Sequence, residues 1–239
     1  MLPWQLNESF PNGWCTAAVD YFGEPKAAYH YVRRAYRPTH VCAALPAPRV
    51  TGAEFAATVW AWSDTGPMAV TARVLGLDGR EIALAEWRGD AGGPRRLGEI
   101  RCAVAELGDG TFLLDLSVRT GTRTRVNRYL LTAGSGFGDL LALPPARMAT
   151  SLETSGDDWT LSLRHEAGPV APFLRLLDDR PADRPGRMRW DDNAVDLLPG
   201  EELVLRCRWD GVPPADRRVL LDGWNVRARV LREEQARWT

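Results

Sequence analysis

Few side chains in this chain of 239 residues combine the type and the placement that chemistry requires. Asp191 and Asp192 are adjacent carboxylates, which could act as an acid and a base or bind calcium. They lie in a predicted turn, where acidic side chains more often accept hydrogen bonds from nearby backbone groups, and we favour that role. Trp4 lies just before the polar segment that starts at Asn7. An indole face at that place could stack on the apolar C–H edge of a sugar ring, with packing inside the protein as the alternative.

Metal, cofactor and thiol chemistry are not predicted. The four cysteines are widely spaced without a Cys-x-x-Cys pair, and the three histidines are scattered. We expect free, buried thiols, with a disulfide between Cys42 and Cys102 left open. The stretch Gly134–Gly138 has some likeness to a nucleotide-binding loop, but Pro144 follows too soon for a helix, so a linker is favoured. The cysteines and histidines are Cys15, Cys42, Cys102, Cys207, His30, His40 and His165.

The elements that must position these residues begin with a strand, a loop and a helix within residues 2–36. The helical pattern runs from Lys26 to Tyr36, and Pro38 ends it. One such unit cannot bury its own strand, because a parallel strand needs neighbours on both edges. We therefore expect the chain to begin with the last piece of something larger, and the helix to pack against the domain that follows it.

The rest of the chain carries strand patterns. Alternating apolar residues and turn signals predict seven or eight short strands between Thr39 and Thr132, as in an immunoglobulin-like β-sandwich, and a second series starts near Ala146. The fold class is therefore mainly β. The predicted domains are 1–37, 38–133 and 146–239, with 134–145 as a linker. The predicted strands are Thr39–Leu45, Glu54–Trp62, Ala69–Leu77, Glu81–Trp87, Gly98–Leu107, Thr111–Thr120, Thr122–Thr132, Met148–Thr154, Asp158–His165, Ala171–Leu177, Glu202–Trp209, Val219–Leu221 and Asn225–Leu231, with Arg88–Arg96 as a loop.

Three stretches carry a resemblance to a known family. Trp4–Asn7 and Asp20–Ala27 are similar to the end of the catalytic barrel in family 2 glycoside hydrolases, most closely the β-mannosidase-like members. Asp192–Glu201 resembles the signature of the last immunoglobulin-like domain in β-mannosidases and related exo-glucosaminidases. The resemblance implies that residues 1–37 are the strand–loop–helix remnant of a TIM barrel, followed by two immunoglobulin-like β-sandwich domains.

The resemblance also implies a function. The intact parent would be a retaining exo-β-glycosidase that acts on a terminal β-linked oligosaccharide or glycoside. Its two catalytic glutamates would lie in barrel strands upstream of this chain, so we expect no catalytic residue here and no activity of the chain alone. Glu8 stands where the family usually has Asp, in the wrong strand for a nucleophile. Trp4 and Asn7 are the expected substrate contacts, and the upstream barrel is the expected partner.

Two other functions stay open. A carbohydrate-binding accessory module would need exposed aromatic side chains on one sheet face, and Trp60 and Trp62 share a face by their spacing of two. A purely structural pair of immunoglobulin-like domains is the second, but it does not explain the strand and helix that precede them.

Charge and hydropathy exclude further classes. The net charge is -1, and a single lysine, Lys26, stands among 30 basic residues. The dispersed arginines form no cluster that would bind nucleic acid. No apolar run approaches the roughly 18 residues of a membrane span, and no signal peptide is visible. The location stays open, with a cytoplasmic one slightly favoured.

Overall fold

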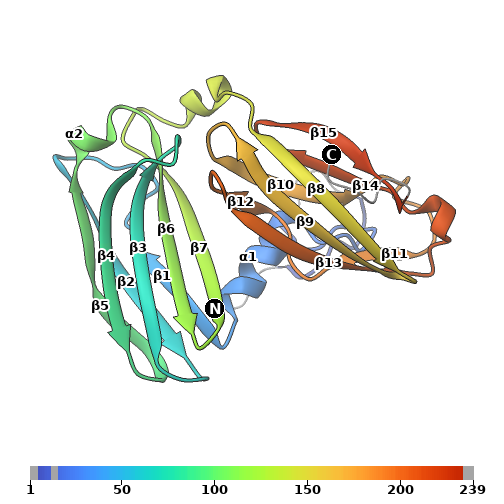
Figure 1. The fold of residues 1–239 in the computed structure, drawn as a ribbon, viewed down its shortest axis with the longest axis horizontal. Helices are drawn as coiled ribbons and strands as arrows, with labels where there is room; N and C mark the ends of the chain where they lie inside the picture. Colours follow the sequence, from blue (N-terminus) through green and yellow to red (C-terminus); the bar gives the residue numbers. More distant parts are fainter. Residues whose placement is uncertain (1–4, 12–15, 234–239) are drawn as a thin grey trace. The chain divides into compact units, whose positions relative to one another are not determined.

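The computed structural model describes residues 5–11 and 16–233. They form two compact units, one of residues 34–143 and one that joins residues up to 33 with residues from 144 onward. All four sheets are antiparallel, and the predicted mainly β, immunoglobulin-like fold class is confirmed (Figure 1). Among the described residues, the helices are too short or too polar to cross a membrane.

The unit of residues 34–143 is a sandwich of two sheets. Apolar side chains alternate inward along its strands, for example Val70, Ala72 and Val74, and Phe55 packs edge-on against Phe112 at 5.2 Å between ring centroids. One sheet has the order β1-β2-β5 and the other β4-β3-β6-β7. The strands are β1 (Thr39–Ala44), β2 (Glu54–Ser63), β3 (Met68–Gly76), β4 (Glu81–Gly89), β5 (Gly92–Ala103), β6 (Thr111–Thr120) and β7 (Arg123–Thr132), with a short helix α2 (Val104–Leu107) after β5.

The predicted loop Arg88–Arg96 is wrong, because β4 continues to Gly89 and β5 starts at Gly92. The glycine-rich stretch pairs with β2 instead, and two register shifts in that pairing absorb its irregular backbone. The predicted strand Gly98–Leu107 is too long, since it ends at Ala103, whose N–H donates to the Glu106 carboxylate at the start of α2.

The second unit holds the other sandwich, with sheet orders β11-β13-β9-β8 and β12-β10-β14-β15. Its core is built around Trp159 and Trp209, both fully buried, with ring centroids 5.3 Å apart. The sequence did not predict β11 (Arg187–Trp190) and β12 (Val195–Leu197), which are very short and flank a turn. The other strands are β8 (Arg147–Ser155), β9 (Asp158–Ala167), β10 (Ala171–Asp178), β13 (Glu202–Asp210), β14 (Val219–Gly223) and β15 (Val226–Leu231), with a short 3-10 helix η2 (Pro214–Asp216). The other 3-10 helix, η1 (Gly138–Ala142), belongs to the unit of residues 34–143.

The N-terminal segment belongs with the second sandwich. Helix α1 (Ala27–Ala35) confirms the predicted helix, but the residues up to Arg33 group with the second sandwich, not the first as expected. The Arg33 guanidinium donates a hydrogen bond to the Asp191 carbonyl at 2.6 Å. This polar contact attaches the helix to the second sandwich, and the apolar pattern of the helix does not predict it. The predicted barrel strand lies partly outside the described residues; within them, Asn7 forms an isolated parallel bridge with Val19.

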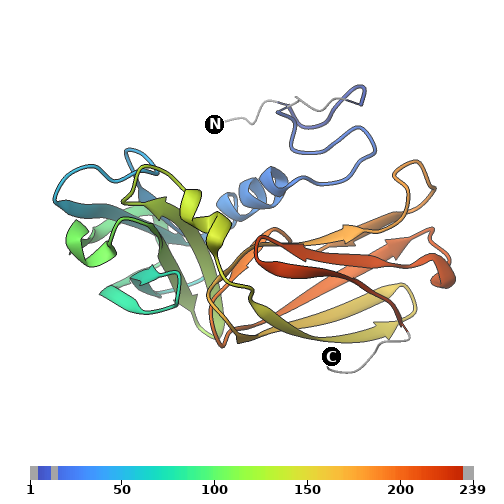
Figure 2. The same ribbon diagram turned by 90° about the horizontal axis from the view of Figure 1, so that it is seen from above.

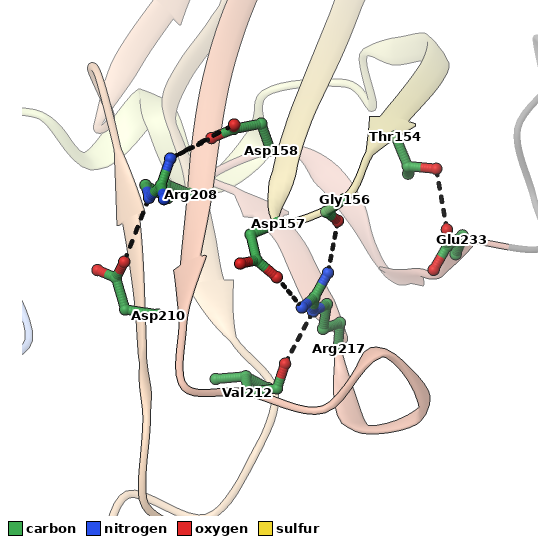
Figure 3. A network of polar contacts seen from close by, with 9 residues as sticks. All are labelled: Thr154, Gly156, Asp157, Asp158, Arg208, Asp210, Val212, Arg217 and Glu233. Carbon is green, nitrogen blue, oxygen red and sulfur yellow. Dashed lines mark hydrogen bonds and ion pairs between the residues drawn. The ribbon is translucent and has the colours of Figure 1, made fainter.

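A buried arginine ties together one end of the second sandwich (Figure 3). The Arg217 side chain is only 4% exposed, and it donates to the carbonyls of Val212 at 3.0 Å and Gly156 at 2.7 Å and to the Asp157 carboxylate. It thereby joins the β8–β9 turn to the segment before β14. Arg208 nearby pairs with acids as well, but it is exposed.

We expect Arg217→Met to lower the free energy of unfolding by about 2–4 kcal/mol, because the carbonyl of the buried Val212 loses its donor and the contacts with Gly156 and Asp157 are lost as well. Arg208→Met is the matched control, with an expected loss below about 1 kcal/mol, since exposed ion pairs contribute little. Urea denaturation of both variants measures the difference, and equal losses would contradict a special role for Arg217.

Candidate functional site

The Asp192–Glu201 motif performs a structural task. The Asn193 side chain is buried, and it accepts the Leu176 N–H at 2.9 Å and donates to the Leu176 carbonyl at 2.8 Å. Strand β12 pairs with β10 through Leu174 and Val195, so a continued register would place Asn193 opposite Leu176. Ala194 turns the backbone away with φ of 51°, and the Asn193 amide replaces the missing strand.

The neighbouring acids are also bound to backbone, as the sequence predicted. Asp191 accepts the N–H of Arg206 at 2.9 Å, and Asp192 accepts that of Asn193 at 2.9 Å. Asp192 also lies 3.9 Å from the ring of the buried His30 on α1. Within the described ranges, no group of three His, Cys, Asp or Glu side chains is placed to hold a metal ion. The turn is therefore a structural junction.

The predicted substrate contacts, Trp4 and Asn7, both stay predictions. Trp4 lies outside the described residues, so its role stays a prediction. Asn7 is exposed, and its amide makes a weak contact of 3.5 Å with the Glu8 carbonyl. Glu8 is buried and forms an ion pair with Lys26, the one lysine of the chain. That pair holds the segment around Asn7 against the start of α1.

The segment before α1 presents large apolar side chains to solvent. Leu6 is 66% exposed and Phe10 59%, and Tyr21 and Phe22 are about half exposed. Phe22 lines a cavity, and none of the four belongs to the hydrophobic core of the second sandwich or packs against it. Apolar groups gathered in this way typically mark a surface that another part of a protein covers.

A cavity of about 500 Å³ lies between this segment and the second sandwich. Its walls include Asp20 and Glu24 on one side and Asp178 and Arg187 on the other, and Figure 2 shows the N-terminal segment beside the loop that joins β10 and β11. No sequence signal pointed to Glu24, because its setting depends on residues more than 150 positions away.

Glu24 is an acidic residue of this cavity whose pKa is shifted. Burial raises the pKa of its carboxyl to about 7, and the nearby carboxylates of Asp178 and Asp20 add to the rise. Arg180 and Arg187 offset part of it. The carboxyl is therefore partly protonated near neutral pH, a property found both at binding sites and in structural clusters.

The aromatic pair considered for carbohydrate binding is largely engaged within the first sandwich. Trp60 and Trp62 do share the outer face of β2, and both are half-buried. The Trp62 indole N–H donates to the Arg37 carbonyl at 3.1 Å, and its ring lies 5.0 Å from that of His40. Cys42 on the neighbouring strand is a free thiol, as are Cys102 and Cys207.

The fold defines a protein with two immunoglobulin-like sandwiches and an N-terminal appendage. Residues 128–226, less than half of the chain, match the family model of the exo-β-D-glucosaminidase Ig-fold domain. No protein of curated function matches the sequence. The findings support a likeness to the C-terminal region of family 2 glycoside hydrolases, and they do not single out the β-mannosidases.

Solved structures agree in fold. The chain superposes on the exo-chitosanase CsxA of Amycolatopsis orientalis with a TM-score of 0.68 and 18% identity, over 96% of this chain and 30% of that one. A second structure of CsxA, which concerns its inhibition by a glucosamine-configured castanospermine, gives the same values. A variant of it in complex with PNP-β-D-glucosamine gives 0.67 and 17% over the same shares. The chain thus spans about 30% of the length of these proteins, and at this identity the likeness shows the fold alone.

We expect Asn193→Ala to cost about 2–4 kcal/mol of folding free energy, because it leaves the buried N–H and C=O of Leu176 unpaired. Asn7→Ala is the matched control, and its effect should stay within about 0.5 kcal/mol, since the Asn7 amide is exposed. Thermal and urea unfolding of both variants provide the comparison. A tolerated Asn193→Ala would show that water or a backbone shift satisfies Leu176.

Glu24 should make folding depend on pH. Because its pKa is raised from 4.5 to about 7, the folded state holds an extra proton between these values, and stability falls as pH rises through that window. Glu24→Gln imitates the protonated form, so it should flatten this part of the profile and be more stable than the parent at pH 8. Glu153→Gln, an exposed change on β8, should leave the profile unchanged. Urea denaturation from pH 4 to 8 measures this, and parallel profiles for the parent and Glu24→Gln would contradict it.

Proposed function

We propose that this chain is the C-terminal region of a retaining exo-β-glycosidase of family 2, whose intact form releases terminal β-linked sugars. The observation that carries the proposal is the match of residues 128–226 to the exo-β-D-glucosaminidase Ig-fold domain. The barrel-like motifs in Trp4–Asn7 and Asp20–Ala27 add support from a different part of the chain. A purely structural domain pair would not account for them.

The exposed N-terminal side chains support an upstream partner. Leu6, Phe10 and Tyr21 would be covered if this segment closed a β/α barrel formed by residues that precede it in the parent. The buried Glu8–Lys26 pair would then fix the end of the barrel to α1. The share of about 30% in CsxA agrees with a parent several times longer than this chain.

The proposed substrate is a terminal β-linked amino sugar, because the matching domain family is named for exo-β-D-glucosaminidases. A β-mannoside is the second candidate, because the N-terminal motif is closest to the β-mannosidase-like members. In either case the acid and the nucleophile come from the upstream barrel, and this chain supplies substrate contacts through Trp4 and Asn7.

The chain alone should show no turnover of aryl β-glucosaminide or β-mannoside, whereas the parent protein should hydrolyse one of them. In the parent, Trp4→Ala should lower kcat/KM roughly 30- to 1,000-fold, through loss of stacking and positioning. Asn7→Ala should also lower kcat/KM while leaving the melting temperature unchanged. Turnover by the isolated chain that disappears when one of its own residues is changed would refute the proposal.

A further inference from the structure

The first sandwich carries a hollow of about 320 Å³ on the outer face of the sheet β4-β3-β6-β7. Its floor is made of short side chains, Ala69, Thr71 and Ser117, and two arginines, Arg88 and Arg119, line it from the neighbouring strands. All five side chains alternate with core residues along their strands, so they point away from the core.

The strand register brings the two arginines together. Arg88 on β4 and Arg119 on β6 are both paired with Ala69 on β3, one on each side. With neighbouring strands about 4.8 Å apart, their Cα atoms are on the order of 10 Å from each other, within reach of two long side chains. The methyl group of Ala69 leaves the space between them open. Thr71 is paired with Ser117, which places two hydroxyl groups side by side below.

The charge of these arginines is not neutralised by an ion pair with a described residue, in contrast to the row of the same face that lies beyond Thr71 and Ser117. There, Arg73 and Arg128 share the buried carboxylate of Asp115, at 2.6 and 2.7 Å. Within the described part of the chain, neither Arg88 nor Arg119 has a carboxylate within 4 Å. Their juxtaposition is therefore electrostatically unfavourable until an anion joins them.

Glu86 is the opposing charge in the hollow. It also lines the space, and it is paired with Thr71 on the β4 side of the floor. The three charged side chains therefore give the hollow a net charge of about +1. Glu86 weakens the attraction for an anion without cancelling it, and this provides a variant that should strengthen binding.

We propose that this hollow binds a tetrahedral oxyanion, a sulfate or phosphate group, through the guanidinium groups of Arg88 and Arg119 and the hydroxyl groups of Thr71 and Ser117. Guanidinium forks and hydroxyl donors match the several acceptor oxygens of such a group. The site is separate from the proposed glycosidase chemistry, because every residue that forms it lies in the first sandwich.

The test is a titration of the chain with sodium sulfate at constant ionic strength, followed through the backbone amide NMR signals of β3 and β6. We expect a saturable shift confined to these strands, with a Kd on the order of 1 mM. Arg88→Gln and Arg119→Gln should each weaken binding at least about fivefold, since each removes a charged donor. Glu86→Gln should strengthen it, which a variant that merely disturbed folding would not do.

Arg49→Gln is the control, since it removes the same charge outside the hollow. Arg49 is exposed, and its backbone forms a β-bridge with Thr132, at the end of β7 opposite to Thr124, which lines the hollow. It should leave the Kd unchanged. Inorganic phosphate in place of sulfate should shift the same signals. Shifts that do not saturate, or a Kd that stays the same in the doubly substituted Arg88→Gln, Arg119→Gln chain, would overturn the proposal.

Discussion

The hydrogen bonds between the Asn193 amide and the backbone of Leu176 organise the second sandwich. Strand β12 is too short to cover the edge of β10, and both backbone polar groups of Leu176 are satisfied by one side chain, that of Asn193, just before β12 begins. The residues before Asn193 belong to the opposite sheet, where Asp191 accepts the Arg206 N–H. One turn thus joins the two sheets, and a substitution that leaves one partner of such a buried hydrogen-bonded pair unpaired is costly.

The same turn anchors the N-terminal helix. Arg33 donates to the Asp191 carbonyl, and His30 lies beside Asp192, so α1 is held by groups whose positions Asn193 determines. From there the chain runs back to Lys26, which forms the ion pair with Glu8, and to Glu24, which lines the cavity. The place of any substrate contact near Asn7 therefore depends on polar contacts made at the far end of the helix.

The sequence predicted the elements that follow a simple period, and it failed where long-range pairing decides. Thr111–Thr120 has the predicted bounds because every second residue from Phe112 to Val118 is apolar. Gly92–Ala103 starts in a stretch rich in glycine and arginine, and only its pairing with β2 makes it a strand. Likewise the partner of α1 and the setting of Glu24 depend on loops distant in sequence, which no local pattern encodes. The sequence places Asn193 in a motif, but its structural role depends on the register of β10 and β12, which the motif does not encode.

The Glu24 cavity invites comparison with a glycosidase site, since an acid of raised pKa near a second carboxylate is the usual arrangement there. The surroundings of the second carboxylate, that of Asp178, argue against a glycosidase site. Both oxygens of Asp178 accept hydrogen bonds from Arg180, at 2.7 to 3.1 Å, and this pair is almost fully buried. A carboxylate neutralised and enclosed in this way cannot approach an anomeric carbon as a nucleophile. Glu24 and Asp178 therefore do not replace the pair of glutamates that the proposed chemistry requires. The raised pKa of Glu24 comes first from burial of its carboxyl, and the carboxylates of Asp178 and Asp20 add to it.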